Sequence, residues 1–117
     1  MKLPKTLINS RTGQKILLAL LFHPEKSKGM TRNEIYDFLY CHGVIMSYVS
    51  FAEAKVVLKK SGLISVHKVP KPSLSHNLKL NPKYFNTEKY KDPAMKEQIM
   101  EKLQILNSPA KYVFDRI

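Results

Sequence analysis

The stretch from Thr31 to Gly62 constrains the fold most, because it carries the start and stop signals of two helices in succession. Thr31 and Glu34 have the spacing of a capping box, in which the Thr hydroxyl accepts the Glu34 N–H and the carboxylate accepts the Thr31 N–H. Gly43 is placed to end the first helix, and Gly62 is placed to end the second. The stretch predicts two short helices joined by a turn, which is longer than in the usual helix-turn-helix.

Each of these two helices carries an apolar face. The residues at the spacing of one face are Ile35, Phe38, Leu39 and His42 in the first helix, and Phe51, Ala54 and Leu58 in the second. The start of the second helix is open to two interpretations. Ser50 and Glu53 form a second capping box, whereas a cap at Ser47 would add one turn. Both apolar faces predict packing against a shared core.

A hydrophobic helix is expected before this pair, from Ser10 to Phe22. Its second half, Ile16 to Phe22, is apolar on every side, which is typical of a buried helix. We therefore expect it to be the central helix against which the two capped helices pack. Pro24 ends it, and residues 1–9 before it are predicted to form a basic N-terminal arm.

The hydrophobic period changes after the second capped helix. Leu63 to Val69 is rich in β-branched residues and partly alternates, and Leu78 to Asn81 alternates again. Between them, Pro70 to Asn77 is rich in turn residues and carries a lysine. The chain is therefore predicted to be mainly α with a small β-hairpin.

The order of these elements from Ser10 to Tyr84 resembles the winged helix-turn-helix superfamily. Leu58 to Ile64 is similar to the L-x-x-x-G-L-I junction common in its bacterial and archaeal members, and Leu78 to Lys83 resembles the strand that closes the wing. The resemblance implies a winged helix domain over residues 10–84, with a recognition helix that begins at Ser47 or shortly after and a wing over residues 70–77. Because it is a likeness of pattern, it supports the fold more strongly than the function.

The charge of the chain favours a polyanionic partner. Lys and Arg number 20 against 9 Asp and Glu, which gives a net charge of +11 and a pI near 9.8. Residues 1–83 hold 14 of these cations and 4 of the acids, whereas residues 84–117 hold 6 and 5. The basic field therefore belongs to the helix-turn-helix portion, where it suits nucleic acid or an anionic membrane surface; a lysine-rich solvated surface is the alternative.

The candidate DNA-binding residues lie on the outward side of the second capped helix and on the hairpin. They are Ser47, Tyr48, Val49, Ala52, Val56, Lys59, Lys60, Lys68, Lys71, His76 and Lys79. We expect the lysines of the hairpin to contact phosphates or the minor groove. The outward helix face is rather apolar and lacks the Arg, Asn and Gln that read base edges, although Ala and Val can contact thymine methyls. Specificity is then modest and helped by DNA shape, or the helix meets a protein instead.

The sequence thus predicts a protein that binds double-stranded DNA, most simply a transcriptional regulator acting as a homodimer. The alternative is a winged helix used as a protein-interaction adaptor in a replication or transcription assembly. A third possibility is binding of RNA or single-stranded nucleic acid, with bases stacked on Tyr48, although no stacking-platform motif supports it.

Residues 85–117 are predicted to form a connection and a C-terminal helix. Asp92 is a good N-cap and Pro93 suits the first helical position. The apolar stripe of this helix is assigned to dimerisation and consists of Met95, Ile99, Leu103 and Leu106. A partner's identical helix is the simplest cover for such a stripe. The alternative is that the stripe packs on the helices of its own domain.

The sequence lacks the patterns of catalytic and metal sites. Cys41 and His42 are adjacent on a helix and point about 100° apart, so we expect buried packing residues and not a nucleophile with its base. The histidines have no metal-ligand spacing, and no nucleotide-binding motif occurs. We therefore expect no enzyme activity, no metal and no cofactor.

Cellular location is predicted from three features. A single cysteine fits a reducing compartment, and the first residues lack the pattern of a secretory signal. The longest apolar run, Ile16 to Phe22, has 7 residues, against about 20 for a membrane span. The expectation is a cytoplasmic protein that does not enter a membrane.

Overall fold

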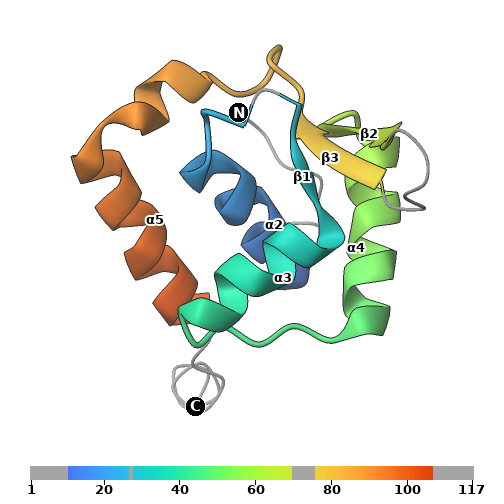
Figure 1. Cartoon of the computed structure of the whole chain (residues 1–117), viewed down its shortest axis with the longest axis horizontal. Coiled ribbons are helices and arrows are strands. Elements are labelled where there is room, and N and C mark those ends of the chain that lie inside the picture. Colours follow the sequence, from blue (N-terminus) through green and yellow to red (C-terminus); the bar gives the residue numbers. More distant parts are fainter. Residues whose placement is uncertain (1–10, 27, 70–75, 107–117) are drawn as a thin grey trace.

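The computed structural model describes residues 11–26, 28–69 and 76–106. It is mainly helical, with a small three-stranded antiparallel sheet (Figure 1). The elements in chain order are α2 (Arg11–Phe22), β1 (Met30–Thr31), α3 (Arg32–Cys41), α4 (Tyr48–Lys60), β2 (Ile64–Lys68), β3 (His76–Leu80), the 3₁₀ helix η1 (Thr87–Lys91) and α5 (Pro93–Leu106). The predicted N-terminal arm, and Lys71 with most of the predicted wing, lie outside the described residues.

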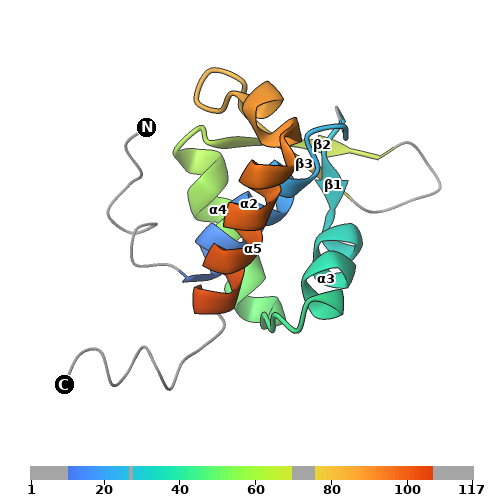
Figure 2. The same cartoon turned by 90° about the vertical axis from the view of Figure 1, so that its left-hand side faces the viewer.

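Helix α2 lies at the centre of the molecule, as its apolar sequence predicts. Ile16 and Ala19 are fully buried, and Leu17, Leu20 and Leu21 are nearly so. Helices α3, α4 and α5 all pack against it, and Figures 1 and 2 show them arranged around it. One helix therefore supplies the common surface of the core.

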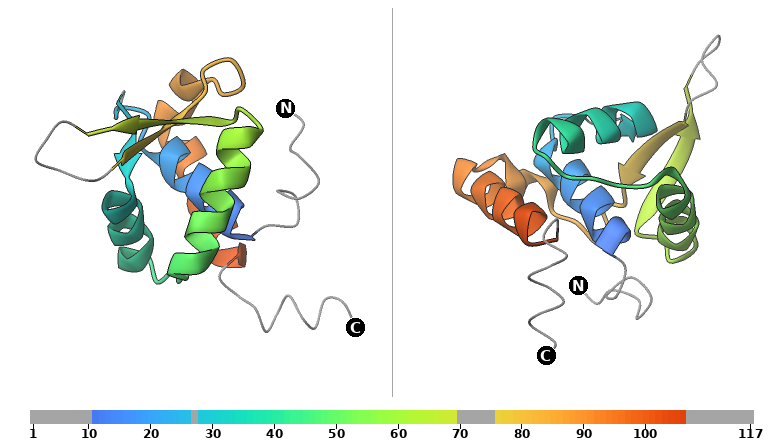
Figure 3. Two further views of the ribbon diagram at one scale, coloured as in Figure 1. Left: turned by 90° about the vertical axis from the view of Figure 1, so that its right-hand side faces the viewer. Right: turned by 90° about the horizontal axis from the view of Figure 1, so that it is seen from below.

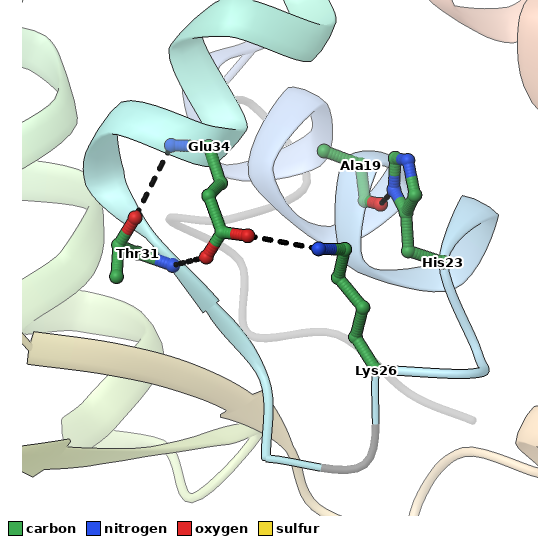
Figure 4. Close-up of polar contacts among 5 residues, drawn as sticks. All are labelled: Ala19, His23, Lys26, Thr31 and Glu34. Atoms are coloured by element: carbon green, nitrogen blue, oxygen red, sulfur yellow. Dashed lines mark hydrogen bonds and ion pairs between the residues drawn. The ribbon is translucent and has the colours of Figure 1, made fainter. Parts of the chain in front are cut away.

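The capping box at the start of α3 is present as predicted. The Thr31 hydroxyl accepts the Glu34 N–H at 3.2 Å, and the Glu34 carboxylate accepts the Thr31 N–H at 2.9 Å (Figure 4). The same carboxylate accepts a hydrogen bond from Lys26 Nζ at 2.8 Å. Because Thr31 also ends β1, this cap fixes the direction in which α3 leaves the sheet.

Helix α4 takes the longer of its two predicted forms. Ser47 is the N-cap, and its hydroxyl accepts the Ser50 N–H at 3.1 Å, so that Ser50 lies inside the first turn. Phe51, Ala54 and Leu58 are buried, as the apolar face predicts. The helix ends before Gly62, whose φ of +78° is the left-handed conformation expected there.

The sheet contains a strand that sequence analysis did not predict. The strand order is β1-β3-β2, and β1 pairs Met30 with Leu78 and Thr31 with Asn77. Gly29, just before β1, has φ of +89°, and a Cβ there would lie 2.3 Å from the Leu78 carbonyl oxygen. Glycine therefore lets the chain pass close enough to β3 for the strand to form.

Helix α5 is held against α2 by a cation at each end. Lys96 near the start of α5 donates to the carbonyl of Phe22 at the end of α2, and Arg11 at the start of α2 donates to the carbonyl of Leu106 at the end of α5. The two helices therefore run antiparallel. Each cation meets the carbonyl end of the other helix, where the helix dipole is negative.

The apolar stripe of α5, which the sequence analysis assigned to dimerisation, is largely buried within the single chain. Ile99 and Leu103 are 2% and 0% exposed in the single chain, and they belong to the same core as α2. Of the two covers that the sequence left open, the structure shows the helices of the chain itself, because α5 packs on α2; Met95 and Leu106 are partly buried. Phe85 is buried in this core as well.

The expectation that Cys41 and His42 are buried was also wrong. Both are exposed, because α3 ends at Cys41 and the chain there lies beyond the edge of the core. The His42 ring instead lies 4.9 Å from the Phe38 ring, which is itself partly buried. Among the described helices, none has the length and apolar character that crossing a membrane requires.

Replacing Leu103 with Ala should lower the free energy of unfolding by about 2–5 kcal/mol, because the substitution leaves a cavity at a fully buried site. Urea unfolding followed by circular dichroism measures the loss. Gln98→Ala, an exposed position on the same helix, is the control and should change stability by about 0.5 kcal/mol or less. A similar small effect for Leu103→Ala would mean that α5 is not part of the core.

Glu34→Ala should lower the free energy of unfolding at pH 7 by about 1 kcal/mol, because the capping box and the contact with Lys26 are both lost. The hydrogen bonds from Lys26 and Thr31 hold the pKa of Glu34 below its ordinary value of 4.5. Since the folded-state pKa is the lower one, this contribution is present above pH 4.5 and is lost as pH falls through the folded-state pKa.

The measurement is the difference in unfolding free energy between wild type and Glu34→Ala across acidic pH. It should shrink below pH 4.5. Asp37→Ala removes an exposed acid from the same helix and serves as the control. A wild-type advantage that stays constant down to about pH 2 would contradict the assignment.

Candidate nucleic-acid interface

Helix α4 has one buried side, which faces the core, and one exposed side, which faces outward. The predicted residues on it that are exposed are Ser47, Tyr48, Val49, Ala52, Val56, Lys59 and Lys60. Tyr48, in the first turn, is 63% exposed. In Figures 1 and 3, α4 and the β2–β3 hairpin lie on the side of the molecule away from α5. The exposure predicted from the helical period is confirmed.

A concave surface of about 340 Å³ lies beside α4, between the start of α3 and the start of β3. Its lining residues are Arg32, Asn33, Tyr48, Phe51, Ala52, Lys55, His76 and Leu78. Two of these residues are cations, a third is a histidine, and none is acidic. Such a lining gives the hollow a positive local potential, which attracts an anion.

Arg32 connects the start of α3 to the start of α4. Its guanidinium carbon lies 4.6 Å from the centre of the Tyr48 ring, a distance at which the cation is attracted to the ring face. The Tyr36 ring lies 5.5 Å from the ring of Phe51, which lines the same hollow. The Tyr36 hydroxyl is buried with no hydrogen-bond partner among the described residues, and burial raises its pKa. Arg32 thus links Tyr48, in the first turn of α4, to the start of α3.

The register of the hairpin places Lys68 directly opposite His76. Both share the face of the sheet that carries buried Leu78, because residues two apart on a strand point to the same side. The pairing of Thr31 with Asn77, continued by one residue, brings Arg32 beside His76, in agreement with the lining of the hollow. Positive and titratable side chains from α3, β2 and β3 therefore gather at one end of the sheet.

Lys79 does not join this group. It pairs with Ser65 on the opposite face of the hairpin, and it lines a different hollow with Lys26 and Lys91. The hairpin residues predicted to contact DNA are therefore divided between the two faces of the sheet, with Lys79 on the face opposite to Lys68 and His76. The reason is the alternation of side chains along a strand, which separates Lys79 from Lys68 even though the hairpin brings the two strands together.

Three residues of the hollow were missed by sequence analysis, namely Arg32, Asn33 and Lys55. Lys55 follows Tyr48 by seven positions and Ala52 by three, so the helical period could have placed it on the same flank of α4. Arg32 and Asn33 gave no such signal. They reach the hollow only because β1 pairs with β3 and carries the start of α3 to the hairpin.

The connection between α3 and α4 is anchored from α2. Lys15 is 8% exposed and donates a hydrogen bond to the Ile45 carbonyl at 2.6 Å. Burial lowers the pKa of Lys15, and the nearby charge of Arg11 lowers it further. Val44 and Met46 are buried on either side of Ile45, which is itself 77% exposed. The anchored turn therefore holds an apolar side chain at the surface close to the start of α4.

The side chains at this surface can attract an anion through their positive charge. Across residues 11–26, 28–69 and 76–106, no three His, Cys, Asp or Glu side chains are grouped closely enough to hold a metal ion. The side chains around the hollow offer two cations, one amide, two aromatic rings and an imidazole. Comparison with protein-family models, with curated proteins and with solved structures finds no match for this chain.

Proposed function

We propose that this chain is a DNA-binding protein of the winged helix-turn-helix type, most simply a transcriptional regulator. In this proposal α4 is the recognition helix and the β2–β3 hairpin is the wing. Support comes from an exposed helix face beside a projecting hairpin, which is the arrangement that the sequence resemblance implies. Helix α4 has 13 residues and is therefore about 20 Å long, and a major groove is wide enough to admit a helix.

The observation that carries the proposal is the acid-free hollow beside α4. Arg32 and Lys55 face it from two helices, and His76 faces it from the hairpin. Phosphate groups of a duplex lie on both sides of a groove, so cations that flank a recognition helix can hold it in register. The exposed acid of α4, Glu53, is not among the lining residues. The duplex would therefore approach on the Arg32 flank.

The outward face of α4 suits shape and methyl recognition. Val49, Ala52 and Val56 offer apolar contacts to thymine methyl groups, and Tyr48 and Lys59 add polar atoms. Bidentate base contacts of the kind made by Arg or Asn would have to come from Arg32 or Asn33, at the start of α3. We expect modest specificity, with a preference for sites that contain thymines.

The burial of α5 in the single chain changes the oligomeric state that we propose for the regulator. The argument for a homodimer was an apolar stripe in need of cover, and α2 covers Ile99 and Leu103. We therefore propose that one chain binds one site through one recognition helix. A dimer would have to use a surface other than this stripe.

A protein-interaction adaptor is the second candidate. The exposed apolar side chains around the α3–α4 connection favour it, and they are Tyr40, Ile45, Tyr48 and Val49. Contiguous exposed apolar groups often mark a protein interface. In this alternative the outward face of α4 meets a partner protein, and the basic hollow steers the encounter.

Selection of duplex sequences from a random pool tests the leading proposal. The full chain should enrich a short, non-palindromic site containing thymines, because a single helix reads one stretch of major groove. Sedimentation equilibrium on the same sample should give the mass of a monomer. Enrichment of a palindromic site would support a homodimer instead of a monomer. Absence of binding at about 0.1 M salt would favour the protein-interaction adaptor.

The salt dependence of binding tests which cations meet the duplex. Arg32→Ala and Lys55→Ala should each weaken binding and reduce the log–log salt slope by about 0.9, since each removes one phosphate contact. Lys79→Ala removes the same charge from the opposite face of the hairpin and should leave the slope unchanged. Equal effects of all three substitutions would show that only the net charge matters, and would remove the hollow from the interface.

A further inference from the structure

A second surface lies on the other side of α2, between α2, η1 and α5. It is a groove of about 660 Å³. Its lining residues are Gln14, Leu17, Leu18, Leu21, Tyr84, Phe85, Asn86, Lys89, Tyr90, Lys102, Ile105 and Leu106. Figure 2 views the molecule from this side, with α5 in front of α2. The groove shares no lining residue with the hollow beside α4.

The groove has an apolar floor and an exposed apolar rim. Leu17, Leu21 and Phe85 form its buried part. Ile105 on the rim is 62% exposed, and Tyr84 is exposed as well. Apolar side chains that remain in water beside a groove are typical of a binding surface. Their burial would be the main favourable term for an apolar partner.

The length of the groove suits a short helix. From α2 it takes Gln14, Leu17, Leu18 and Leu21, which are spaced as one face of about two turns. From α5 it takes Lys102, Ile105 and Leu106, at the i, i+3 and i+4 positions of another helix face. Two such walls form the kind of apolar channel into which an amphipathic helix can lay its apolar side.

The charges at the rim select the partner. The side chains of Lys89 in η1 and Lys102 in α5 are exposed, and neither makes a hydrogen bond or ion pair within the described residues. No acidic residue lines the groove. A second copy of this chain carries a net charge of +11, and residues 1–10 and 107–117 of the chain itself are also net basic, so none of these complements the rim.

We propose that this groove binds an amphipathic helix of an acidic partner protein. The apolar side of the helix lies on Leu17, Leu18 and Ile105, and its acidic flanks meet Lys89 and Lys102. The proposal does not depend on DNA binding, because the two surfaces use different residues. If both proposals hold, the chain can bind a duplex and a partner protein at the same time.

A designed peptide tests the proposal directly. The probe is a fluorescein-labelled helix of about 16 residues, with leucines along one face and glutamates on both flanks. Its anisotropy is measured against the full chain at about 0.1 M salt, where remote charges are screened. Saturable binding is expected, with NMR shifts confined to the groove and including Leu18 and Ile105. A matched peptide with lysines in place of the glutamates should bind at least about tenfold more weakly.

Charge reversal distinguishes a specific site from general attraction. The double variant Lys89→Glu and Lys102→Glu should bind the glutamate peptide about tenfold more weakly and should bind the lysine peptide more tightly than wild type does. Lys59→Glu with Lys60→Glu makes the same change of net charge on α4. This control should keep peptide affinity within about twofold, while weakening any binding to DNA.

Ile105→Ser tests the apolar part of the site. The side chain is exposed, so the fold should tolerate the change, and peptide affinity should fall about fivefold.

Equal losses in the two charge-reversal variants would overturn the proposal, as would NMR shifts on α4. Absence of saturable binding up to about 1 mM would also overturn it. Tight binding of decanoate without binding of the peptide would assign the groove to a small apolar acid instead.

Discussion

The burial of α2 is the constraint on which the rest of the structure depends. Each CH₂ group that leaves water stabilises the fold by about 0.8 kcal/mol, and α2 presents such groups on every side. A single neighbour covers only one side of a helix, so several elements must surround it. Helices α3 and α4 meet α2 on part of its surface, and α5 meets it on another. The C-terminal helix is therefore a necessary part of the core.

The ends of the helices could be predicted because their signals are local. Thr31 and Glu34 bond to each other's backbone within one turn, and Asp92 accepts the Ala94 N–H at the start of α5, as expected for an N-cap. The choice between Ser47 and Ser50 could not be made in this way, since both offer a hydroxyl before the same helix. In the structure Ser47 is the cap, and Met46 just before it is buried.

Features that depend on contacts between residues far apart in the chain could not be predicted from the sequence. Strand β1 has only two residues and exists because Gly29 allows a close approach to Leu78, which is remote in the chain. The stripe of α5 shows the same limit: its period identifies an apolar face but not the surface that covers it. For the candidate site, the exposed face of α4 followed from helical period. Arg32 did not, because its position results from the pairing of β1 with β3.

The two candidate surfaces are linked through the one helix between them. Lys15 of α2 anchors the α3–α4 connection at the Ile45 carbonyl, while Arg11 of the same helix holds the carbonyl end of α5. Within α2, Ile16 and Ala19 point away from Leu17, Leu18 and Leu21, which line the groove. A partner in the groove would therefore meet the opposite side of α2 from these two buried residues. Any effect of such a partner on α4 would require α2 itself to shift, and a close-packed core opposes such a shift.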